Sequence, residues 1–433
     1  MKKKVSSWGC LTSDLHDVKK INDLPSYNSI FDGVSQGIVY GNGRSYGDIC
    51  LNPEGELWES SKLNKFINFD KNSGILTCES GVLIKDINEI FICQGWMLPV
   101  TAGTQFITIG GSIANDIHGK NHHVFGSFGN HICSLDILRS DGQIFHCEPN
   151  NNTDLFHATI GGLGLTGIIL SARIQLRKVA GSYVKCENIP YESLDEFFSI
   201  ALESEDNWEH TVSWLDCTSS NLGRGIFTRG NFIKNQSNDR RKKINLNIPF
   251  KPPISLINKV SLNVFNKSYF NIKKRGNKNF NQHYQGFLYP LDNILNWNRI
   301  YGPNGFYQYQ SVIPKDNAFD ATKEMLNEIK SSGEGSFLAV LKTFGKKDSI
   351  GMLSFPMEGV TLALDFPNRK NKTSQLFNKL DDIVKEASGR VYLAKDARMS
   401  SSFFKETYPN YNEFLNLVDK KFSSSMSKRL LDI

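Results

Sequence analysis

Three glycine-rich segments lie in the first 185 residues, and they constrain the fold more than any other feature. They are GNGRSYGD at 41–48, the stretch at 103–123, and GGLGLTG at 161–167. Clustered glycines let backbone N–H groups converge on a phosphate without obstruction by side chains. Three such loops in one β-rich region predict a long anionic ligand held between sheets.

The first of these segments is not the dinucleotide-binding fingerprint G-x-G-x-x-G. Position 46 is Tyr where that pattern requires its third glycine, and no helical pattern follows the loop. Taken alone, a loop of this kind is more often a tight turn than a ligand site. The ligand hypothesis therefore depends on the three segments together.

Periodic patterns of apolar residues predict an α+β chain in two lobes. Strand-like runs and turns fill the first 185 residues, with one amphipathic helix that carries Ile84, Ile87 and Phe91 and stops at Gly95. After about residue 184, strand-like runs alternate with helices. These helices are expected after Ser193, near 316–330, and near 373–387 between strands at 360–364 and 391–393.

The order of the motifs resembles that of a known enzyme family. GRSYGD, then DIHGKNHH, then GGLGLTGII is similar to the vanillyl-alcohol-oxidase-like FAD enzymes, and within them to the decaprenylphosphoryl-β-D-ribose 2-oxidase group. The resemblance implies an α+β fold in two lobes, with a PCMH-type FAD-binding domain over 1–183 and 390–433. It implies a substrate domain over 184–389, built on a mainly antiparallel sheet with flanking helices.

The resemblance also implies which residues hold FAD. The expected cofactor-binding positions are Gly41, Asn42, Gly43, Arg44, Ser45, Tyr46, Gly47, Gly103, Thr108, Gly110, Gly111, Asn115, His118, Ile169 and Tyr392. Many relatives hold the flavin covalently through a His in the first glycine loop, where this sequence has Arg44. Because a guanidinium cannot form that bond, we expect FAD to be bound non-covalently.

Flavin oxidation of a secondary alcohol needs a proton acceptor for the hydroxyl and donors that steady the developing charge. The resemblance implies three catalytic residues: Lys395, His118 and Tyr46. Of these, we expect Lys395 to be nearest to proton transfer. It implies four residues that bind the substrate: Lys120, Gln310, Lys342 and Thr361. These types suit the task, since lysines neutralise a phosphodiester and a glutamine amide both donates and accepts hydrogen bonds.

The reaction that the resemblance implies is oxidation of the 2-hydroxyl of a polyprenyl-phosphate-linked pentose, of the ribose type, to the 2-keto sugar. A short-chain reductase partner would complete an epimerisation for cell-envelope glycan synthesis. Two alternatives stay open at this point. One is an aldonolactone or sugar-alcohol oxidase, and the other is a flavin-free binding protein for glycan assembly.

The histidines at 118, 122 and 123 have a spacing that also suits a metal ion. Gly119 follows the first of them, and no cysteine or carboxylate ligand set accompanies the group. We therefore expect no metal. We expect His122 and His123 to be structural hydrogen-bond partners.

Charge is distributed unevenly along the chain. The whole sequence has 50 Lys and Arg against 44 Asp and Glu, but 229–280 alone contains thirteen basic residues and one acid. We expect a flexible basic segment at about 231–280. One interpretation of this segment is nucleic-acid binding, which we do not expect because positive charge alone is unspecific evidence for it. A second interpretation is a solvated loop. The apolar residues between the basic clusters favour a third interpretation, which is peripheral contact with an anionic membrane surface.

Three further features bear on the location of the protein. There is no run of 18 or more apolar residues, and the basic start at 2–4 is not followed by the apolar core of a signal peptide. The eight cysteines show no C-x-x-C pair, which suits a reducing compartment. We expect a cytoplasmic protein without a signal peptide, with peripheral contact at the inner membrane face.

Overall fold

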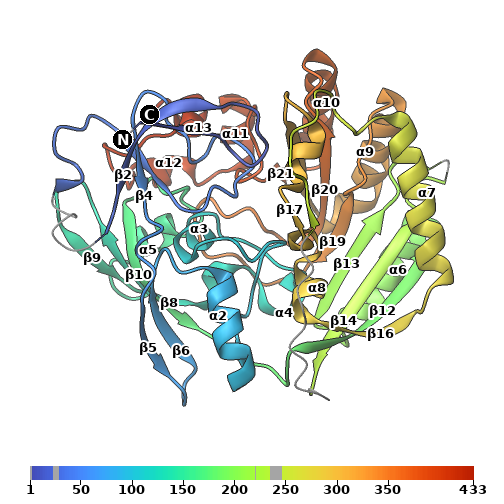
Figure 1. The fold of residues 1–433 in the computed structure, drawn as a ribbon, viewed down its shortest axis with the longest axis horizontal. Helices are drawn as coiled ribbons and strands as arrows, with labels where there is room; N and C mark the ends of the chain where they lie inside the picture. Colours follow the sequence, from blue (N-terminus) through green and yellow to red (C-terminus); the bar gives the residue numbers. More distant parts are fainter. Residues whose placement is uncertain (1, 23–28, 220, 235–245) are drawn as a thin grey trace.

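The computed structural model describes residues 2–22, 29–219, 221–234 and 246–433. The chain forms two lobes that lie side by side (Figure 1). The first lobe contains β1 to β11, and both ends of the chain lie on it. The second lobe contains the strands and helices from β12 to β21.

Two sheets and a short ladder form the first lobe. The strand order of the four-stranded sheet is β1 (Lys2–Val5), β2 (Asp14–Lys20), β4 (Glu56–Glu59), β3 (Gly37–Tyr40). In this sheet β4 is parallel to both of its neighbours, β2 and β3. The order of the five-stranded antiparallel sheet is β5 (Phe66–Asp70), β6 (Ile75–Glu79), β10 (Ile168–Gln175), β8 (Ile132–Leu138), β9 (Ile144–Cys147). The ladder joins β7 (Trp96–Met97) to β11 (Arg177–Lys178). The helices of this lobe are α2 (Ile84–Phe91), α3 (Ile109–Ala114), α4 (His122–Phe125) and α5 (Thr153–Thr159).

A single eight-stranded antiparallel sheet forms the second lobe. Its strand order is β16 (Asn279–His283), β12 (Tyr183–Tyr191), β14 (Gly225–Ile233), β13 (His210–Leu215), β19 (Val340–Phe344), β20 (Gly359–Pro367), β18 (Phe306–Pro314), β21 (Arg390–Val391). A separate parallel pair joins β15 (Leu246–Asn247) to β17 (Ile294–Leu295). The helices are α6 (Leu194–Ser204), α7 (Lys259–Arg275), α8 (Tyr284–Leu288), α9 (Ala318–Ser332) and α10 (Asn371–Glu386).

The two faces of this sheet have different roles. Leu362 and Leu364 on β20 join a buried core with apolar residues of α6, α9 and α10. Because successive side chains of a strand point to opposite faces, Ala363 and Asp365 face away from those helices. α7 lies on that other face, where Tyr269 packs against Trp214 of β13 with ring centroids 4.7 Å apart. One face is therefore closed by helices, and the other is left for the site described below.

The α+β class and the mainly antiparallel sheet with flanking helices are confirmed. α2 begins at Ile84 as predicted, and the chain leaves the following 3₁₀ turn at Gly95, whose φ of +79° is left-handed. α6 begins after Ser193, whose hydroxyl oxygen accepts from the backbone N–H of Glu196 at 3.3 Å. β20, α10 and β21 form the predicted β-α-β unit, with β18 between the two strands.

The expectation of a flexible loop over about 231–280 is wrong for the described part of that segment. α7 is a 17-residue helix whose start is capped by the side chain of Asn258, and β16 pairs with β12. The buried stripe of α7 consists of Leu262, Asn266 and Phe270. Because Asn266 is polar, the stripe does not stand out in the sequence as a helical pattern of apolar residues. The basic cluster at 239–243 lies outside the described residues.

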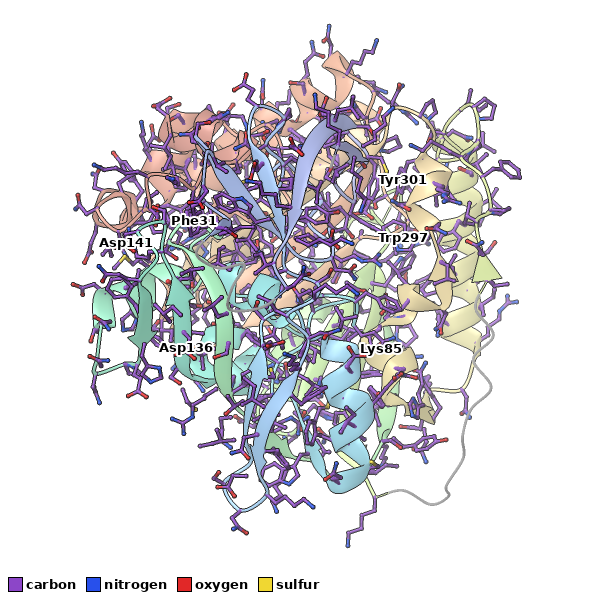
Figure 2. The ribbon with its side chains drawn as sticks, turned by 60° about the vertical axis from the view of Figure 1, so that its left-hand side comes forward. Phe31, Lys85, Asp136, Asp141, Trp297 and Tyr301 are labelled. Atoms are coloured by element: carbon purple, nitrogen blue, oxygen red, sulfur yellow. The ribbon has the colours of Figure 1, made fainter. Side chains whose placement is uncertain are left out.

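After β21 the chain returns to the first lobe and closes its core. The returning helices are α11 (Ser401–Thr407), α12 (Tyr411–Leu415) and α13 (Ser425–Leu431). Phe422 packs against Phe31 and Trp58, with ring centroids 5.9 and 4.9 Å away, on the side of the molecule where Figure 2 labels Phe31. Gly37, at the start of β3, donates its N–H to the carbonyl of Lys421 at 2.9 Å. The strand that leads into the first glycine loop is therefore held by the end of the chain.

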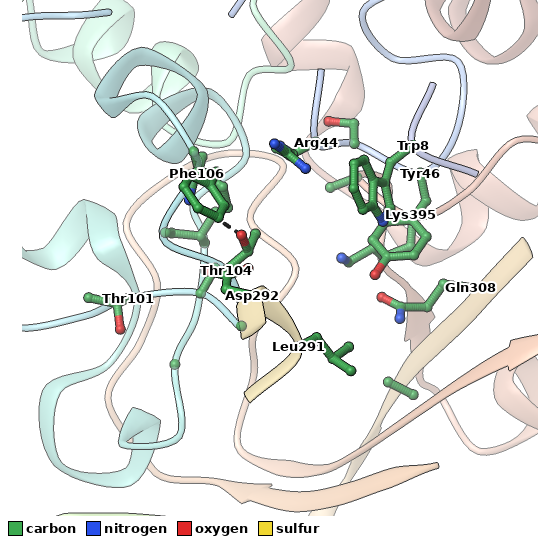
Figure 3. Close-up of a pocket in the computed structure, with 18 of the residues that line it drawn as sticks. Trp8, Arg44, Tyr46, Thr101, Thr104, Phe106, Leu291, Asp292, Gln308 and Lys395 are labelled. Carbon is green, nitrogen blue, oxygen red and sulfur yellow. Dashed lines mark hydrogen bonds between the residues drawn. The ribbon is translucent and has the colours of Figure 1, made fainter. Parts of the chain in front are cut away.

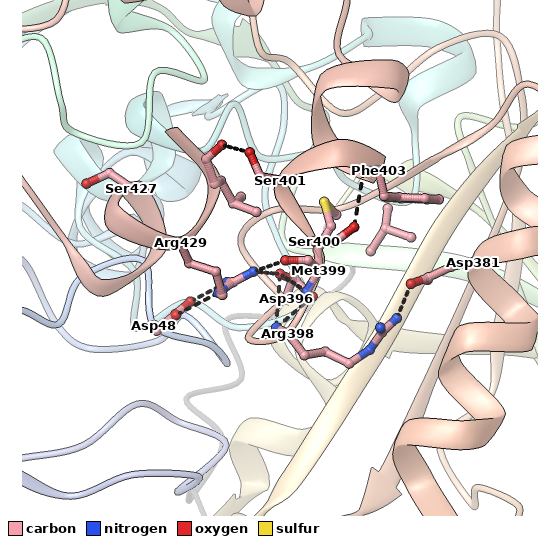
Figure 4. A network of polar contacts seen from close by, with 12 residues as sticks. Asp48, Asp381, Asp396, Arg398, Met399, Ser400, Ser401, Phe403, Ser427 and Arg429 are labelled. Atoms are coloured by element: carbon pink, nitrogen blue, oxygen red, sulfur yellow. Dashed lines mark hydrogen bonds and ion pairs between the residues drawn. The ribbon is translucent and has the colours of Figure 1, made fainter. Parts of the chain in front are cut away.

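A network of buried and half-buried charges continues this connection (Figure 4). The Arg429 guanidinium of α13 donates to Asp48 Oδ1 at 2.8 Å and lies 3.0 Å from Asp396 Oδ2. The Asp396 carboxylate also accepts from the backbone N–H of Arg398 and Met399. Arg398 pairs with Asp381 of α10 at 2.5 Å. A chain of ion pairs and backbone hydrogen bonds thus runs from the first glycine loop to a helix of the second lobe.

All eight cysteines are free thiols, and Cys93 is exposed. Within the described ranges, no helix has both the length and the apolar composition that crossing a membrane requires.

Replacing Arg429 with Met tests the charge network. The change leaves Asp48 and Asp396 in place without their shared cation, and removing one partner of a buried ion pair costs about 3–5 kcal/mol. We expect the free energy of unfolding, measured by urea titration, to fall by about 3 kcal/mol because Arg429 is partly exposed.

Lys385→Met is the matched control for this change. Lys385 pairs with Glu406 at 2.7 Å, but both side chains are about half exposed, and exposed pairs contribute little. An unfolding midpoint that moves equally in the two variants would show that the network is not a structural anchor.

Candidate active site

A cavity of about 850 Å³ lies where the two lobes meet. The first lobe lines it with all three glycine-rich segments, and the second lobe lines it with the open face of its sheet and with α7. In Figure 3, Thr104 and Phe106 lie on one side of this cavity and Lys395 and Gln308 on the other. The volume is near the upper end for small-molecule sites, as an elongated ligand requires.

Glycine is required in the first loop because the loop is packed closely against its neighbours. A Cβ on Gly41 would lie 2.6 Å from Thr108 Oγ1, and Gly43 has a left-handed φ of +59°. Thr108 caps α3, since its hydroxyl oxygen accepts from the N–H of Gly111 at 3.1 Å. The first and second glycine segments therefore meet at Thr108, and both line the cavity.

The structure brings most of the predicted residues to this cavity. Those that line it are Gly41, Asn42, Gly43, Arg44, Ser45, Tyr46, Gly103, Thr108, Gly110, Gly111, Asn115, His118, Ile169, Tyr392, Lys395, Lys120, Gln310 and Lys342.

Gly47 and Thr361 are the two predicted residues outside the cavity lining. Gly47 lies against backbone, where a Cβ would be 1.6 Å from the carbonyl oxygen of Asp396. Thr361 is buried, and its hydroxyl oxygen accepts from Gln310 Nε2 at 3.2 Å. Each of the two contacts a neighbour of the cavity: Gly47 lies against the segment that carries Lys395, and Thr361 bonds to Gln310.

Three polar atoms of cavity-lining residues are buried and have no hydrogen-bond partner among the described residues. They are Arg44 Nε, Ser80 Oγ and Asn115 Oδ1. A buried polar atom without a partner costs about 1–3 kcal/mol. Arg44 itself is held by rings, with its guanidinium carbon 4.4 Å from the centroid of Trp8 and 5.3 Å from that of Phe106. The first-lobe side of the cavity is therefore suited to a ligand with several polar groups.

Three half-buried lysines from different elements also line the cavity: Lys120 of the second glycine segment, Lys342 of β19 and Lys395 of the segment after β21. Burial lowers their pKa values from the usual 10.5, to about 8 for Lys120, about 7 for Lys342 and about 8 for Lys395. Repulsion from Lys120 and Lys395 lowers the pKa of Lys342 further, whereas the carboxyl of Asp365 opposes the shift at Lys395. Such a concentration of cations with little counter-charge favours an anionic ligand.

His118 connects this lysine cluster to Gln310. Its Nδ1 lies 3.0 Å from Lys342 Nζ, and its Nε2 lies 2.9 Å from Gln310 Nε2. Burial and the charge of Lys342 hold the pKa of His118 well below its usual range, so the ring is neutral. A neutral imidazole donates from one nitrogen only. If the Gln310 amide donates to Nε2, the Nδ1–H faces Lys342 Nζ and can be accepted by the neutral form of that amine, which its pKa of about 7 makes accessible.

Tyr46 and Lys395 form a second polar group in the cavity. Lys395 Nζ lies 3.9 Å from the centroid of the Tyr46 ring. Burial raises the pKa of Tyr46 well above its usual range, so its hydroxyl is a hydrogen-bond donor and not a base. Gln308 Nε2 donates to Asp365 Oδ1 at 2.6 Å, and burial raises the pKa of Asp365 to about 7. Of the two members of this group with pKa values near neutral pH, Lys395 lines the cavity and Asp365 does not.

Three residues in or beside the cavity were not predicted from the sequence: Gln308, Asp365 and Asp292. Gln308 and Gln310 alternate along β18, so they share the cavity face, and the two-residue spacing in YQYQ at 307–310 is the signal that finds Gln308. Asp365 is the register partner of Gln308 on β20. Asp292 has no comparable signal, because a short irregular segment brings it to the cavity, where its Oδ2 accepts from the N–H of Gln105 at 2.9 Å.

One wall of the cavity comes from a segment that was expected to be a flexible loop. Phe265, Tyr269 and Lys273 of α7 line it, at the four-residue spacing of one helix stripe. The aromatic rings add an apolar region beside the lysine cluster. The cavity therefore has a polar part between the lobes and an apolar part toward α7.

His122 and His123, which do not line the cavity, differ in their contacts. His123 Nε2 bonds to the carbonyl of Trp208 at 2.7 Å, as expected for a structural hydrogen bonder. For His122 that expectation is wrong: over the described part of the chain neither of its ring nitrogens has a partner. Its ring instead packs on Phe344, with centroids 4.4 Å apart. No group of three or more metal-ligating side chains gathers among the residues described.

Several known proteins have sequences similar to that of this chain. The FAD binding domain family matches residues 36–148, which include the first two glycine segments. A decaprenylphosphoryl-beta-D-ribose oxidase from Mycolicibacterium smegmatis is 35% identical over 412 residues, covering 91% of this chain and 88% of that protein. This chain belongs to the decaprenylphosphoryl-β-D-ribose oxidase family.

More distant relatives match shorter stretches. L-gulonolactone oxidase from Mus musculus is 29% identical over 139 residues, and Delta(24)-sterol reductase from Homo sapiens is 28% identical over 155 residues. These matches cover 32% and 35% of this chain. The lactone-oxidase alternative is therefore supported over only a third of the chain, whereas the family match covers nearly all of it. The chain is an FAD-dependent oxidoreductase with a PCMH-type FAD-binding domain, and the flavin-free alternative is set aside.

The residues of the first lobe fit FAD. Gly41, Gly43 and Gly111 keep side chains away from the cavity, as a pyrophosphate close to the backbone requires. The partnerless Arg44 Nε, Ser80 Oγ and Asn115 Oδ1 provide donors and acceptors for its polar groups. The lysine cluster lines the same cavity, and its amines suit a second, anionic ligand.

The pH dependence of stability tests the lysine cluster. The pKa of Lys342 is about 7 in the folded chain and 10.5 when unperturbed, so between these pH values the unfolded chain binds the proton more tightly. Stability therefore rises with pH over this window in the flavin-free protein. We expect Lys342→Met to be more stable than the wild type at pH 7 and the difference to shrink toward pH 10, measured by urea titration.

The exposed Lys346, just beyond the end of β19, provides the control for this measurement. Lys346→Met should run parallel to the wild type from pH 7 to 10. An unchanged slope in Lys342→Met would contradict the depressed pKa.

Proposed function

We propose that this protein oxidises the 2-hydroxyl of a polyprenyl-phosphate-linked pentose, of the ribose type, to the 2-keto sugar. The observation that carries the proposal is the lysine cluster, which occupies the same cavity as the glycine-lined FAD site. The relative that matches over most of both chains is named for this substrate class. A phosphodiester is the group in such a substrate that a cluster of cations recognises.

Lys120 and Lys342 are the residues that bind the phosphate in this proposal. Lys120 Nζ donates to the carbonyl of Phe287 and lies 4.9 Å from the centroid of that ring, so its position is fixed without a carboxylate. Lys342 Nζ is held between His118 Nδ1 and the carbonyl of Gly119, each at 3.0 Å. An anion beside these amines raises their pKa values again. Substrate binding is therefore coupled to proton uptake by the cluster.

Removal of the 2-hydroxyl proton falls to Lys395. With a pKa of about 8, this amine is partly neutral near neutral pH and can accept a proton. Bound FAD supplies the acceptor for the hydride that leaves C2 of the sugar. Gln308 and Gln310, two residues apart on β18, offer both donors and acceptors to the sugar hydroxyls. The hydroxyl oxygen becomes the ketone oxygen, and the proton resides on Lys395 Nζ.

Non-covalent binding of FAD is part of the same proposal. Among the described residues that line the cavity, the only His and Cys side chains are His118 and Cys50. Both ring nitrogens of His118 are engaged with Lys342 and Gln310. Burial raises the pKa of the Cys50 thiol to about 12, so little thiolate is present to form a bond.

The product chemistry implies a partner. A 2-keto sugar on a lipid phosphate becomes an epimer when a second enzyme returns a hydride to the opposite face of the ketone. We therefore expect a short-chain reductase to act on the product.

Reduction of the flavin by candidate substrates tests the proposed function. Under anaerobic conditions, a polyprenyl-phosphate-linked ribose should abolish the visible absorbance of the oxidised flavin. Lys395→Met should retain its flavin but reduce it about 10²- to 10⁴-fold more slowly, the usual contribution of a general base. Lys346→Met, an exposed lysine, should behave as the wild type.

Lys120→Met separates the substrate classes in the same assay. Loss of a hydrogen bond to a charged group costs about 1.5–3 kcal/mol, so the half-saturating concentration of the lipid-linked sugar should rise about 10- to 100-fold. A free sugar alcohol or aldonolactone should not respond to this change. If such a compound reduced the flavin as fast as the phosphate-linked sugar, the protein would be assigned to the lactone and polyol oxidases.

Acid precipitation tests the mode of flavin attachment. Trichloroacetic acid should precipitate a colourless protein and leave all flavin in the supernatant. Flavin fluorescence in the washed pellet would disprove non-covalent binding, and peptide mapping would then decide between His118 and Cys50.

A further inference from the structure

Exposed apolar side chains are concentrated in one segment of the second lobe. Of the sixteen large apolar residues that are exposed among the described residues, eight lie between Leu246 and Ile272. We call six of them the outer apolar face: Leu246, Phe250, Ile254, Leu256, Val260 and Val264. Phe250, Ile254 and Val260 are each at least 70% exposed. A soluble protein rarely leaves so many large apolar side chains together without a binding role.

The charge of this segment has a single sign. Lys251, Lys259 and Lys267 are exposed between and beside the residues of the outer apolar face. The sequence from 246 to 290 contains no Asp or Glu. Apolar side chains interspersed with lysines are the composition that binds an anionic lipid surface, where each Lys or Arg near the headgroups adds attraction.

The backbone that carries the outer apolar face is fixed to the second lobe. Arg299 Nη1 donates to the carbonyls of Ile248 and Pro249, at 2.9 and 2.7 Å. Leu256 donates its N–H to the carbonyl of Ile300 at 2.9 Å. Ile257 and Leu262 lie beneath the face in a core with Trp297 and Tyr301, which Figure 2 shows beside the yellow elements of this lobe. The apolar side chains are therefore presented by an ordered scaffold.

α7 connects the outer apolar face to the cavity. Val260 and Val264 lie on its outward side, whereas Phe265, Tyr269 and Lys273 line the cavity. In Figure 1, α7 runs along the outer edge of the second lobe. Among the exposed large apolar residues described, only Phe265 and Leu295 line the cavity. Leu295 belongs to β17, which pairs with β15 at the start of the outer apolar face. The cavity therefore reaches the surface beside the outer apolar face.

We propose that the outer apolar face docks on an anionic lipid bilayer and places the α7 side of the cavity at the bilayer surface. The inference rests on the proposed function for the nature of the substrate, whose lipid chain can then stay in the bilayer while its sugar phosphate enters the cavity. Charge of one sign favours an anionic bilayer over a protein partner, whose surface would need matching acidic groups.

Co-sedimentation with vesicles tests the proposal without any substrate. The purified holoenzyme should bind vesicles of phosphatidylglycerol and phosphatidylcholine and bind pure phosphatidylcholine much more weakly. The triple variant Phe250→Ser, Ile254→Ser and Val264→Ser should lose at least tenfold in partition coefficient. The pair Lys259→Gln and Lys267→Gln should lose about fivefold per charge on the mixed vesicles only, as expected for about 1 kcal/mol per basic residue.

Leu202→Ser and Ile67→Ser are matched controls. Their side chains are 68% and 56% exposed but lie on α6 and β5, away from the outer apolar face. Both should bind vesicles as the wild type does. In a second measurement, a Phe250→Trp variant should be quenched by brominated lipids, whereas a Leu202→Trp variant should not.

Two results would overturn the inference. The first is vesicle binding that the triple variant retains. The second is a triple variant that changes the oligomeric state on size-exclusion chromatography without changing vesicle binding, which would assign the face to a second copy of this chain. Flavin reduction by a phosphate-linked sugar with a short, soluble lipid should be unaffected in the triple variant. Loss of vesicle binding with intact reduction thus separates this inference from the proposed function.

Discussion

The ion pairs of Arg429 are the interaction on which the rest of the site depends. Its guanidinium joins Asp48, at the end of the first glycine loop, to Asp396, the neighbour of Lys395. Gly47 has to be glycine for the same reason, because the loop backbone lies directly against the carbonyl of Asp396. The first glycine loop and the segment that carries Lys395 are therefore positioned by one cation near the end of the chain. Residues more than 380 positions apart are brought within hydrogen-bond distance of each other.

The electrostatics of the cavity follow from this arrangement. The network satisfies its own carboxylates, so Asp48 and Asp396 pair with Arg429 and are not available to the lysine cluster. Among the described residues, Asp365 is the one group that opposes the lowering of the Lys395 pKa, and burial raises the pKa of Asp365 itself to about 7. The lysines are left with depressed pKa values and spare capacity to bind an anion and a proton together. The same property destabilises the protein without its ligands, which is a common cost of a prepared binding site.

The sequence was sufficient for the α+β class, for the glycine segments and for most residues that line the cavity, because local motifs carry that information. It was insufficient where the role of a residue depends on a distant neighbour. Gly47 and Thr361 were expected to contact ligands, but the first lies against Asp396 and the second behind Gln310. Asp365 became visible only through its register with Gln308. The basic segment was misjudged because the buried stripe of α7 is narrow and contains a polar residue.

The structure also gives a physical reason for the uneven charge of the chain. Outside 229–280 acidic residues outnumber basic ones, so the excess of positive charge belongs to one segment of the second lobe. The described part of that segment is not a solvated loop, since α7 buries Leu262 and Phe270 and lines the cavity with Phe265, Tyr269 and Lys273. A helix used only to close the cavity would have no need of exposed valines and isoleucines on its other side. Because α7 contributes to both surfaces, the attachment proposed above would also determine where the cavity opens relative to a bilayer.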